Sequence, residues 1–461
     1  MLILSAFGLT SCSEEELWGN GSGARAETTT PSGMQRESVM IDFSLAHSRT
    51  TSNDVVVFYS LDGGAFLEAT AVDGTATEDL TVSDDGSSHT FVWDSATDLG
   101  GGRFDNIRIR ISPVSGRSST TDSFAVHNSL FLLAVLDTDE GDGLVSLHDV
   151  DVTSGDTEHL QTLSTAGDTP RGVMYHDRHY IIANQGSDDI SILQLSTSSR
   201  TVSEVTDSPF TSGGASPEYF ALDDDLLFVA NTEAGTITVH EIEGGSGDED
   251  DDTDDEPLSL TWLSDATVDV PGVRSMLVRS GILYAASETE SRIYVFDIDD
   301  DELVANENSP FESEGLSSPR AIARVGAYLI SPSMSASQVA VFRFLGGGEL
   351  GELGSSPFIV NTGAISWVAP YSTNRFFYAA GLSSFGVSDV TSGGAVSENE
   401  VSPVAAGGTV RSVVTASEIV VVGNAGTEEF ELYRQDEDGV LTSAGGAEAQ
   451  GPVRAMAVSE E

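Results

Sequence analysis

The chain has 461 residues and a formal net charge of −54, from 74 acidic and 20 basic residues, and every basic residue is arginine. So strong an acid excess argues against nucleic acid as a partner, because phosphate backbones would be repelled. Two explanations for the acidity stay open: an adaptation to high salt, which we adopt as the working hypothesis, or an acidic exported surface encoded by a GC-rich genome. Abundant Gly, Ser and Thr with little helical periodicity predict an all-β protein.

Residues 1–12 contain an apolar run, LILSAFGLTS, that ends at Cys12. The sequence Leu9-Thr10-Ser11-Cys12 resembles the lipobox of bacterial lipoprotein signals, in which the cysteine becomes the lipid-bearing first residue after cleavage. Cys12 is the single cysteine, so no internal disulfide is possible. We predict lipidation of Cys12 and a lipid anchor that holds the protein to the membrane of the cell envelope. A secreted protein with an ordinary export signal is the alternative.

Residues 13–36 are polar and rich in Gly, Ser and Thr, which predicts a flexible tether. From residue 37 to residue 127 the pattern changes to seven short apolar segments separated by turn residues. The segments are VMIDFSLAH, VVVFYSLDGG, FLEATA, LTVS, HTFVWDS, NIRIRISPVS and DSFAVHN. This pattern is typical of a β-sandwich and resembles immunoglobulin-like domains, in particular the fibronectin-like branch because a cysteine pair is missing. Trp93 is the predicted core aromatic residue.

Residues 128–461 contain a unit that recurs seven times, at a spacing of roughly forty to sixty residues. Its second predicted strand reads FLLAV at Phe131, YIIAN at Tyr180, LFVAN at Leu227, LYAAS at Leu283, YLISP at Tyr328, FYAAG at Phe377 and VVVGN at Val420. This period is typical of β-propellers with one four-stranded blade per repeat. The closing sequence PVRAMAVSEE matches the first strand of the unit, which the first copy lacks. We therefore predict a seven-bladed propeller in which the C-terminal strand completes blade 1.

Blade 3 carries an acidic insertion at residues 243–257, whose crowded like charges predict disorder and only loose, non-specific cation binding. The wording of the repeat, a P-x-G-V strand followed by a strand ending in V-A-N, resembles the YVTN and lactonase-like seven-bladed propellers of bacteria and archaea. The resemblance implies the fold. It is weak evidence for an activity, because the shared residues are structural.

One set of aligned residues could form a site. The same position of the first strand holds Arg171, Glu218, Arg274, Arg320, Ser366, Arg411 and Arg454, which we call the arginine ring. Two residues further on, the aligned position is apolar in every copy, as expected for packing between blades. Because the first strand of a propeller blade borders the central channel, five arginines and one glutamate should converge at one mouth. They would form a local positive site suited to a carboxylate or phosphate.

Alternatively, the ring arginines bond to neighbouring carbonyls or to Glu218 and seal the channel without a ligand. Enzymes of the lactonase-like family work near such a mouth with Arg, Glu and His side chains, and this ring has no His. We therefore predict a monomeric binding or interaction scaffold, with an unknown protein or a small anionic ligand as its partner. A lactonase-like enzyme acting on a sugar acid, with Glu218 as acid or base, and a structural surface component are the alternatives. We find no motif for a metal or a cofactor.

Overall fold

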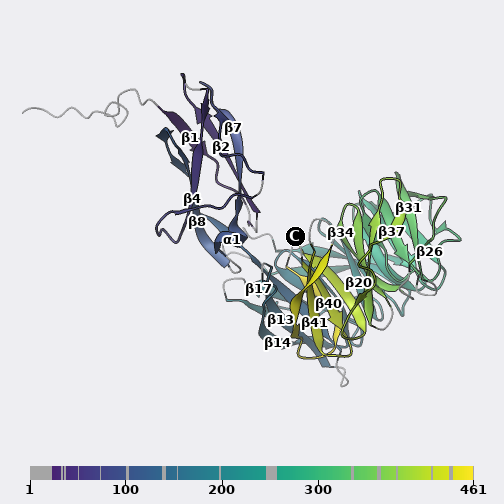
Figure 1. Cartoon of the computed structure of the whole chain (residues 1–461). Helices are drawn as coiled ribbons and strands as arrows, with labels where there is room; N and C mark the ends of the chain where they lie inside the picture. The colour runs from purple at the N-terminus through teal and green to yellow at the C-terminus, as the bar shows by residue number, and fades with distance from the viewer. Residues whose placement is uncertain are drawn as a thin grey trace, which may run out of the picture. The chain divides into compact units, whose positions relative to one another are not determined.

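The computed structural model describes residues 23–459, apart from 33–34, 36–37, 50, 73, 100–102, 138–141, 153, 197–198, 246–256, 334–336, 361–364, 381–382, 417–418 and 436–439. Cys12 and most of the acidic insertion therefore lie outside the described residues. The chain divides into two compact units, Met1–Ser129 and Leu130–Glu461. Apart from one five-residue helix, the described elements are strands, which confirms the all-β prediction (Figure 1). No described helix has the length and apolar character needed to cross a membrane.

Unit 1 contains two larger sheets that face a common core. One sheet has the strand order β7-β2-β1-β9, and the other has the order β10-β8-β4-β5 with β11 also paired to β8. The elements are β1 (Ala24–Thr28), β2 (Ser38–Ala46), β3 (Ser52–Asn53), β4 (Val55–Leu61), β5 (Leu67–Glu68), β6 (Leu80–Thr81), β7 (Ser87–Asp94), α1 (Ser95–Leu99), β8 (Arg103–Pro113), β9 (Gly116–Arg117), β10 (Ser119–Thr120) and β11 (Phe124–His127). Alternate residues of strands such as β2 and β8 are buried, so both sheets turn one apolar face inward.

The core of unit 1 contains Trp93, as the sequence predicts. Its side chain is fully buried and stacks on Tyr59, with ring centroids 5.3 Å apart. The indole Nε1 donates to Asp98 Oδ2 at 2.6 Å, which satisfies the only polar atom of the ring. Asp98 lies in α1 and also accepts hydrogen bonds from the backbone and hydroxyl of Thr70. The core therefore contains, among its aliphatic side chains, an aromatic stack fixed by one carboxylate.

The predicted tether at residues 13–36 is wrong for Ala24–Thr28, which form β1 inside the first sheet. Ala24 and Ala26 are buried and alternate with exposed Arg25 and Glu27, the period of two expected of a strand. A close parallel approach to β9 requires Gly116, where an added Cβ would lie 1.9 Å from the Ala24 carbonyl oxygen. The inward residues are only alanines, so the apolar signal of this strand is too weak to see in the sequence.

Unit 2 contains seven sheets within its described residues, each built in the order first, second, third and fourth strand (Figure 1). Blade 1 consists of β43 (Val453–Val458), β12 (Ser129–Leu136), β13 (Asp142–Asp151) and β14 (Thr157–Asp168). Blade 2 consists of β15 (Pro170–His176), β16 (His179–Asn184), β17 (Asp189–Ser196) and β18 (Thr201–Glu204). Blade 3 consists of β20 (Pro217–Asp223), β21 (Leu226–Asn231), β22 (Thr236–Glu243) and β23 (Ser259–Asp269). The gap between β22 and β23 contains the acidic insertion.

The remaining sheets follow the same order. Blades 4 to 7 are β24 (Val273–Val278), β25 (Ile282–Ser287), β26 (Arg292–Asp299) and β27 (Glu302–Ala305); β29 (Ala323–Val325), β30 (Tyr328–Pro332), β31 (Gln338–Gly346) and β32 (Glu349–Glu352); β34 (Ile365–Ser372), β35 (Arg375–Ala380), β36 (Ser384–Val390) and β37 (Val396–Glu398); β39 (Val410–Ala416), β40 (Ile419–Asn424), β41 (Glu429–Gln435) and β42 (Leu441–Glu448). Four two-residue strands pair a second time with the third strand of their blade: β19 (Phe210–Thr211), β28 (Phe311–Glu312), β33 (Phe358–Ile359) and β38 (Val404–Ala405). These seven sheets confirm the predicted seven-bladed propeller.

The C-terminal strand closes the ring. β43 pairs antiparallel with β12, with Ala457 opposite Leu133 and Met456 opposite Ala134. The Ser459 hydroxyl oxygen accepts from the backbone N–H of Phe131 at 3.0 Å. Blade 1 therefore combines strands from both ends of the unit, as the sequence match predicts.

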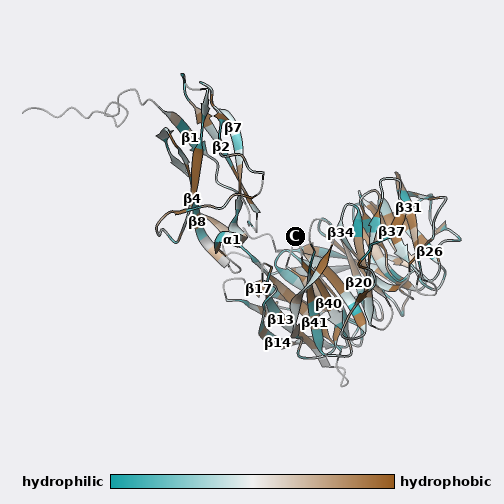
Figure 2. Cartoon of the chain, in the orientation of Figure 1, coloured by the Kyte–Doolittle hydropathy of each residue, from teal (hydrophilic) through white to brown (hydrophobic). Residues whose placement is uncertain are grey.

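Seven apolar clusters join the blades, one at each junction between neighbours. Each cluster takes buried side chains from the second and third strands of two adjacent blades, and hydropathy colouring shows brown strands bordered by paler loops (Figure 2). The aligned apolar residues of the first strands each join one cluster: Val173, Phe220, Met276, Ile322, Val368, Val413 and Met456. This confirms their predicted role in packing between blades.

Candidate functional site

The arginine ring coincides with a β-bulge that recurs in the first strand of the blades. In β15, Pro170 pairs with Asn184 and Gly172 pairs with Ala183, so Arg171 has no partner of its own. The same two-against-one register leaves an extra residue in five further first strands: Glu218, Arg274, Ser366, Arg411 and Arg454. In blade 5, Arg320 lies just before β29. A bulge changes the direction in which the side chain of its extra residue points. The bulge that recurs in the blades therefore determines the orientation of the side chains in the arginine ring.

A second set of residues contacts the ring from the ends of the second strands. Asp137, Gln185, Thr232 and Glu288 each directly follow the second strand of blades 1 to 4. In blade 1, Asp137 Oδ1 lies 3.2 Å from Arg171 Nη1. In blade 2, Gln185 Oε1 accepts from Arg171 Nε at 3.0 Å. These residues were missed in the sequence, although stacking the copies one position past the second strand would have aligned them.

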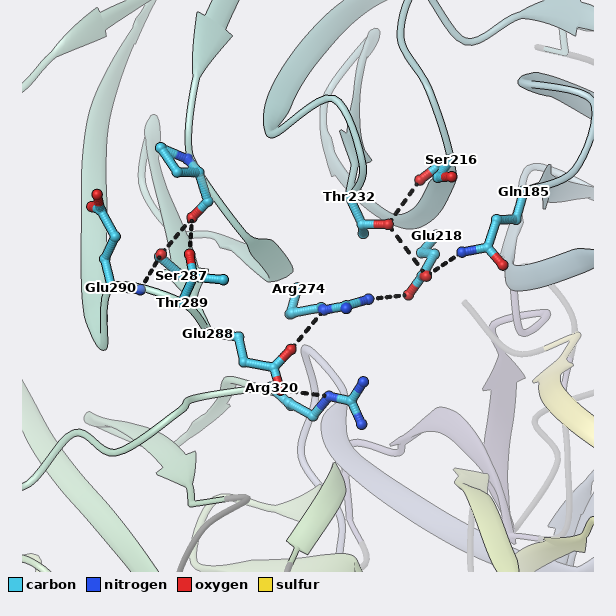
Figure 3. Close-up of polar contacts among 11 residues, drawn as sticks. Gln185, Ser216, Glu218, Thr232, Arg274, Ser287, Glu288, Thr289, Glu290 and Arg320 are labelled. Atoms are coloured by element: carbon cyan, nitrogen blue, oxygen red, sulfur yellow. Dashed lines mark hydrogen bonds and ion pairs between the residues drawn. The ribbon is translucent and has the colours of Figure 1, made fainter.

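Glu218 is the central acceptor of this network (Figure 3). Its Oε1 accepts from Gln185 Nε2 and from the Thr232 hydroxyl, the latter at 3.2 Å, while its Oε2 lies 2.9 Å from Arg274 Nη1. The residue is only 6% exposed. Both carboxylate oxygens are therefore engaged, which leaves Glu218 poorly placed to exchange protons with a ligand.

The network continues through Arg274 into blade 5. Glu288 Oε2 lies 2.8 Å from Arg274 Nε, and Glu288 Oε1 lies 3.2 Å from Arg320 Nε (Figure 3). Burial alone would lower the pKa of Arg274, but Glu218 and Glu288 raise it above its ordinary value. We call the chain of contacts from Asp137 to Arg320 the ion-pair ladder. It connects blades 1 to 5 at one mouth of the channel.

Arg411 and Arg454 differ from the other ring arginines. Among the described residues, neither side chain makes a hydrogen bond or an ion pair within contact distance. Burial is the main cause that lowers the pKa of Arg454, and the nearby charges of Arg171 and Arg411 lower it further. Tyr219 and Asp137 oppose this shift without cancelling it. Blades 7 and 1 thus place two guanidinium groups within electrostatic reach of each other, and among the described residues the nearby Asp137 carboxylate forms its ion pair with Arg171 and not with either of them.

Two aromatic side chains stack on each other at the positions that directly follow two members of the arginine ring. Tyr219 of blade 3 and Trp367 of blade 6 stack with centroids 6.4 Å apart and planes inclined by 30°. Burial raises the pKa of Tyr219, and Glu218 adds to the rise, while Arg274, Arg320 and Arg454 act against it. Trp367 Nε1 donates to the Val413 carbonyl at 3.0 Å. The stack lies within the electrostatic reach of three ring arginines and comes from two blades that are not neighbours.

The ring residues named by the sequence analysis are therefore brought together, but in two arrangements. Arg171, Arg274 and Arg320 join the ion-pair ladder, in which Arg274 bonds Glu218 while Arg171 and Arg320 pair with Asp137 and Glu288. Arg411 and Arg454 stay outside the ladder. Within the described residues, no group of three or more His, Cys, Asp and Glu side chains is arranged to hold a metal ion.

The comparisons with known proteins support the fold. No family model matches the chain, and no relative was found among curated proteins. A periplasmic gluconolactonase of Pseudomonas aeruginosa superimposes with a TM-score of 0.57 at 16% identity, covering 72% of this chain and 99% of its own. A candidate 6-phosphogluconolactonase of Bacteroides fragilis gives a TM-score of 0.59 at 16% identity, covering 72% and 98%. A candidate 6-phosphogluconolactonase of Bacteroides uniformis gives 0.60 at 14% identity, covering 72% and 100%. At these identities the likeness shows that unit 2 has the fold of the lactonase-like seven-bladed propellers.

Proposed function

We propose that the propeller binds a small carboxylate or phosphate anion at the channel mouth, with Arg411 and Arg454 as its main ligands. The observation that carries the proposal is the missing counterion of these two arginines. Every other arginine described in unit 2 has a polar or cation–π partner. With 74 acidic residues in the chain, carboxylates are abundant, yet among the described residues none forms an ion pair with either of these two, and the nearby Asp137 pairs with Arg171.

Electrostatics favours an occupant at this place. Arg454 is half-buried and Arg411 is exposed, and the two like charges repel each other, so an anion between them relieves that repulsion. Guanidinium groups also bind carboxylate and phosphate oxygens in pairs, through parallel N–H donors. The acidic surface around the mouth would slow the approach of an anion at low salt, so we expect the association rate to rise with ionic strength.

A lactone-processing enzyme is the second candidate function, because the three gluconolactonase-type propellers share this fold. Such an activity requires a group that can accept or donate a proton beside the bound ligand. Glu218, the sequence candidate, has both oxygens engaged in the ion-pair ladder. We therefore rank binding above catalysis. Hydrolysis of gluconolactone by the full chain, measured above the spontaneous rate and lost in Glu218→Gln, would reverse that order.

The binding proposal can be tested by calorimetry and thermal unfolding at fixed ionic strength. Phosphate and citrate should bind and raise Tm relative to matched chloride. Arg411→Gln and Arg454→Gln should each abolish the shift. Arg324→Gln is the matched control: it removes the same charge from the first strand of blade 5, where Arg324 is exposed and donates to the Gly326 carbonyl. An equal Tm shift in all four proteins would overturn the proposal.

We further propose that the protein is exported and anchored through Cys12, which would present the propeller as a binding scaffold at the cell envelope. The support is the Leu9-Thr10-Ser11-Cys12 sequence in a chain without another cysteine.

A further inference from the structure

The Tyr219–Trp367 stack gives the proposed anion site a second chemical character. Five of the seven first strands carry a small residue at the position after the ring residue: Gly172, Ser275, Ala321, Ser412 and Ala455. The other two carry Tyr219 and Trp367, whose rings meet each other. The layer next to the arginine ring therefore consists of one aromatic pair among small side chains.

We infer that the ligand is an aromatic dianion, a ring that carries two carboxylates or equivalent acid groups. This inference rests on the proposed anion site and specifies its ligand class. The charge balance at the mouth favours a dianion. Within the described contacts of the mouth, five ring arginines face three carboxylates, those of Asp137, Glu218 and Glu288. The two arginines left over are the two without partners, so a doubly charged occupant restores neutrality.

The layer next to the arginine ring also offers few free hydrogen-bonding groups. The indole N–H of Trp367 is used by the Val413 carbonyl, and the Ser275 hydroxyl accepts from the Ile322 backbone. Ser412 is 1% exposed and its hydroxyl has no hydrogen-bond partner among the described residues, and Tyr219 contributes one more hydroxyl. A ligand with many hydroxyl groups would lose its hydration here without enough replacement hydrogen bonds. An aromatic ring has few hydrogen bonds to water to lose, and it can pack against the Tyr219 and Trp367 rings.

The test uses four probes that separate charge from shape, titrated by calorimetry into the full chain at fixed ionic strength. Phthalate has a ring and two charges, succinate has two charges without a ring, benzoate has a ring and one charge, and gluconate has one charge and many hydroxyls. We expect phthalate to bind about tenfold more tightly than succinate, the size of one good aromatic contact, and more tightly than benzoate and gluconate.

Two variants separate the contribution of the aromatic contact to ligand affinity from that of the arginine charge. Trp367→Leu keeps an apolar side chain but removes the ring, so phthalate should fall to the affinity of succinate while succinate itself is unchanged. Arg454→Gln should weaken both dianions and leave benzoate the least affected. Trp367→Leu could unfold the blade, and Tyr219→Leu, on the opposite side of the stack, then serves as the second variant. Circular dichroism checks folding in each.

The outcomes separate this inference from the anion site itself. Equal binding of phthalate and succinate, or tighter binding of gluconate than of phthalate, would overturn the aromatic class and leave the anion site standing. Failure of all four probes, together with phosphate, to bind the unaltered protein would overturn both.

Discussion

Acid should destabilise the propeller through a buried histidine in blade 3. His240 lies in β22 and is fully buried, and burial lowers its pKa from 6.5 to about 4. The Ser212 carbonyl, 3.2 Å from His240 Nε2, acts in the opposite direction but does not restore the pKa. Nδ1 has no hydrogen-bond partner among the described residues. The fold therefore holds His240 in its neutral form.

The sign and size of the effect follow from proton linkage. Between pH 6.5 and pH 4 the unfolded chain binds a proton at His240 that the folded chain does not, so stability falls as pH falls. The free energy of unfolding should be lower by about 2 kcal/mol at pH 5 than at pH 8, and by about 3.4 kcal/mol once both states are protonated. His148 in blade 1, whose pKa burial also lowers to about 4, should contribute a similar amount.

Urea unfolding of the full chain at several pH values measures this effect, and His240→Leu isolates it. Leucine is the matched replacement because Leu193 occupies the aligned position in blade 2, where it is fully buried. Many carboxylates also titrate in this range, so the informative quantity is the difference in unfolding free energy between the original protein and the variant. That difference should shift in favour of the variant by about 2 kcal/mol from pH 8 to pH 5. A difference that stays constant with pH would refute the assignment of a neutral buried imidazole.

Four further predictions test other parts of the molecule. Raising NaCl from about 0.05 M to about 2 M should raise Tm, because counterions screen the excess acidic charge; a flat or falling Tm would contradict the salt adaptation. Met456→Ala in the closing strand, where the side chain is 3% exposed, should cost about 2–5 kcal/mol in urea unfolding, and a cost below 1 kcal/mol would argue against a packed closure. Glu218→Gln should lower Tm while tightening phosphate binding, since it removes one carboxylate from the mouth; weaker binding in calorimetry would contradict that charge balance. Cys12→Ala should abolish labelling by radioactive palmitate and release the protein from membranes, whereas an unlabelled original protein would rule out the lipid anchor.

The sequence predicted the propeller well because a repeat reports the same structure seven times. A strand such as Tyr180–Asn184 is a weak signal alone, but its recurrence defines the second strand of every blade. The closing strand was predictable for the same reason, since the last residues match a repeat position that the first copy lacks. In unit 1 no repetition exists, and β1 was missed because its inward residues are alanines.

The site was predicted only in part, for a physical reason. Alignment of the copies revealed the ring, because its residues share one strand position. It could not show which arginines would be neutralised, since that depends on contacts between different blades, such as Glu218 with Arg274 and Asp137 with Arg171. It also gave no indication that Tyr219 and Trp367, from blades that are not neighbours, would stack.

Some arginines of the ring are ion-paired and others are not. This difference is the strongest reason to regard the channel mouth as a binding site and not only as a closure of the channel. If the ring arginines only closed the channel, each half-buried one would need a partner, as Arg171, Arg274 and Arg320 have in the ion-pair ladder, whereas the half-buried Arg454 has no ion pair among the described residues. A guanidinium group that is partly buried without a counterion costs stability, and in a chain this acidic a single substitution to Asp or Glu nearby could provide one. Burial is the main cause that lowers the pKa of Arg454, and the charges of Arg171 and Arg411 lower it further. An anion from solution removes that cost, and the stability it restores is the quantity that the Tm shift measures.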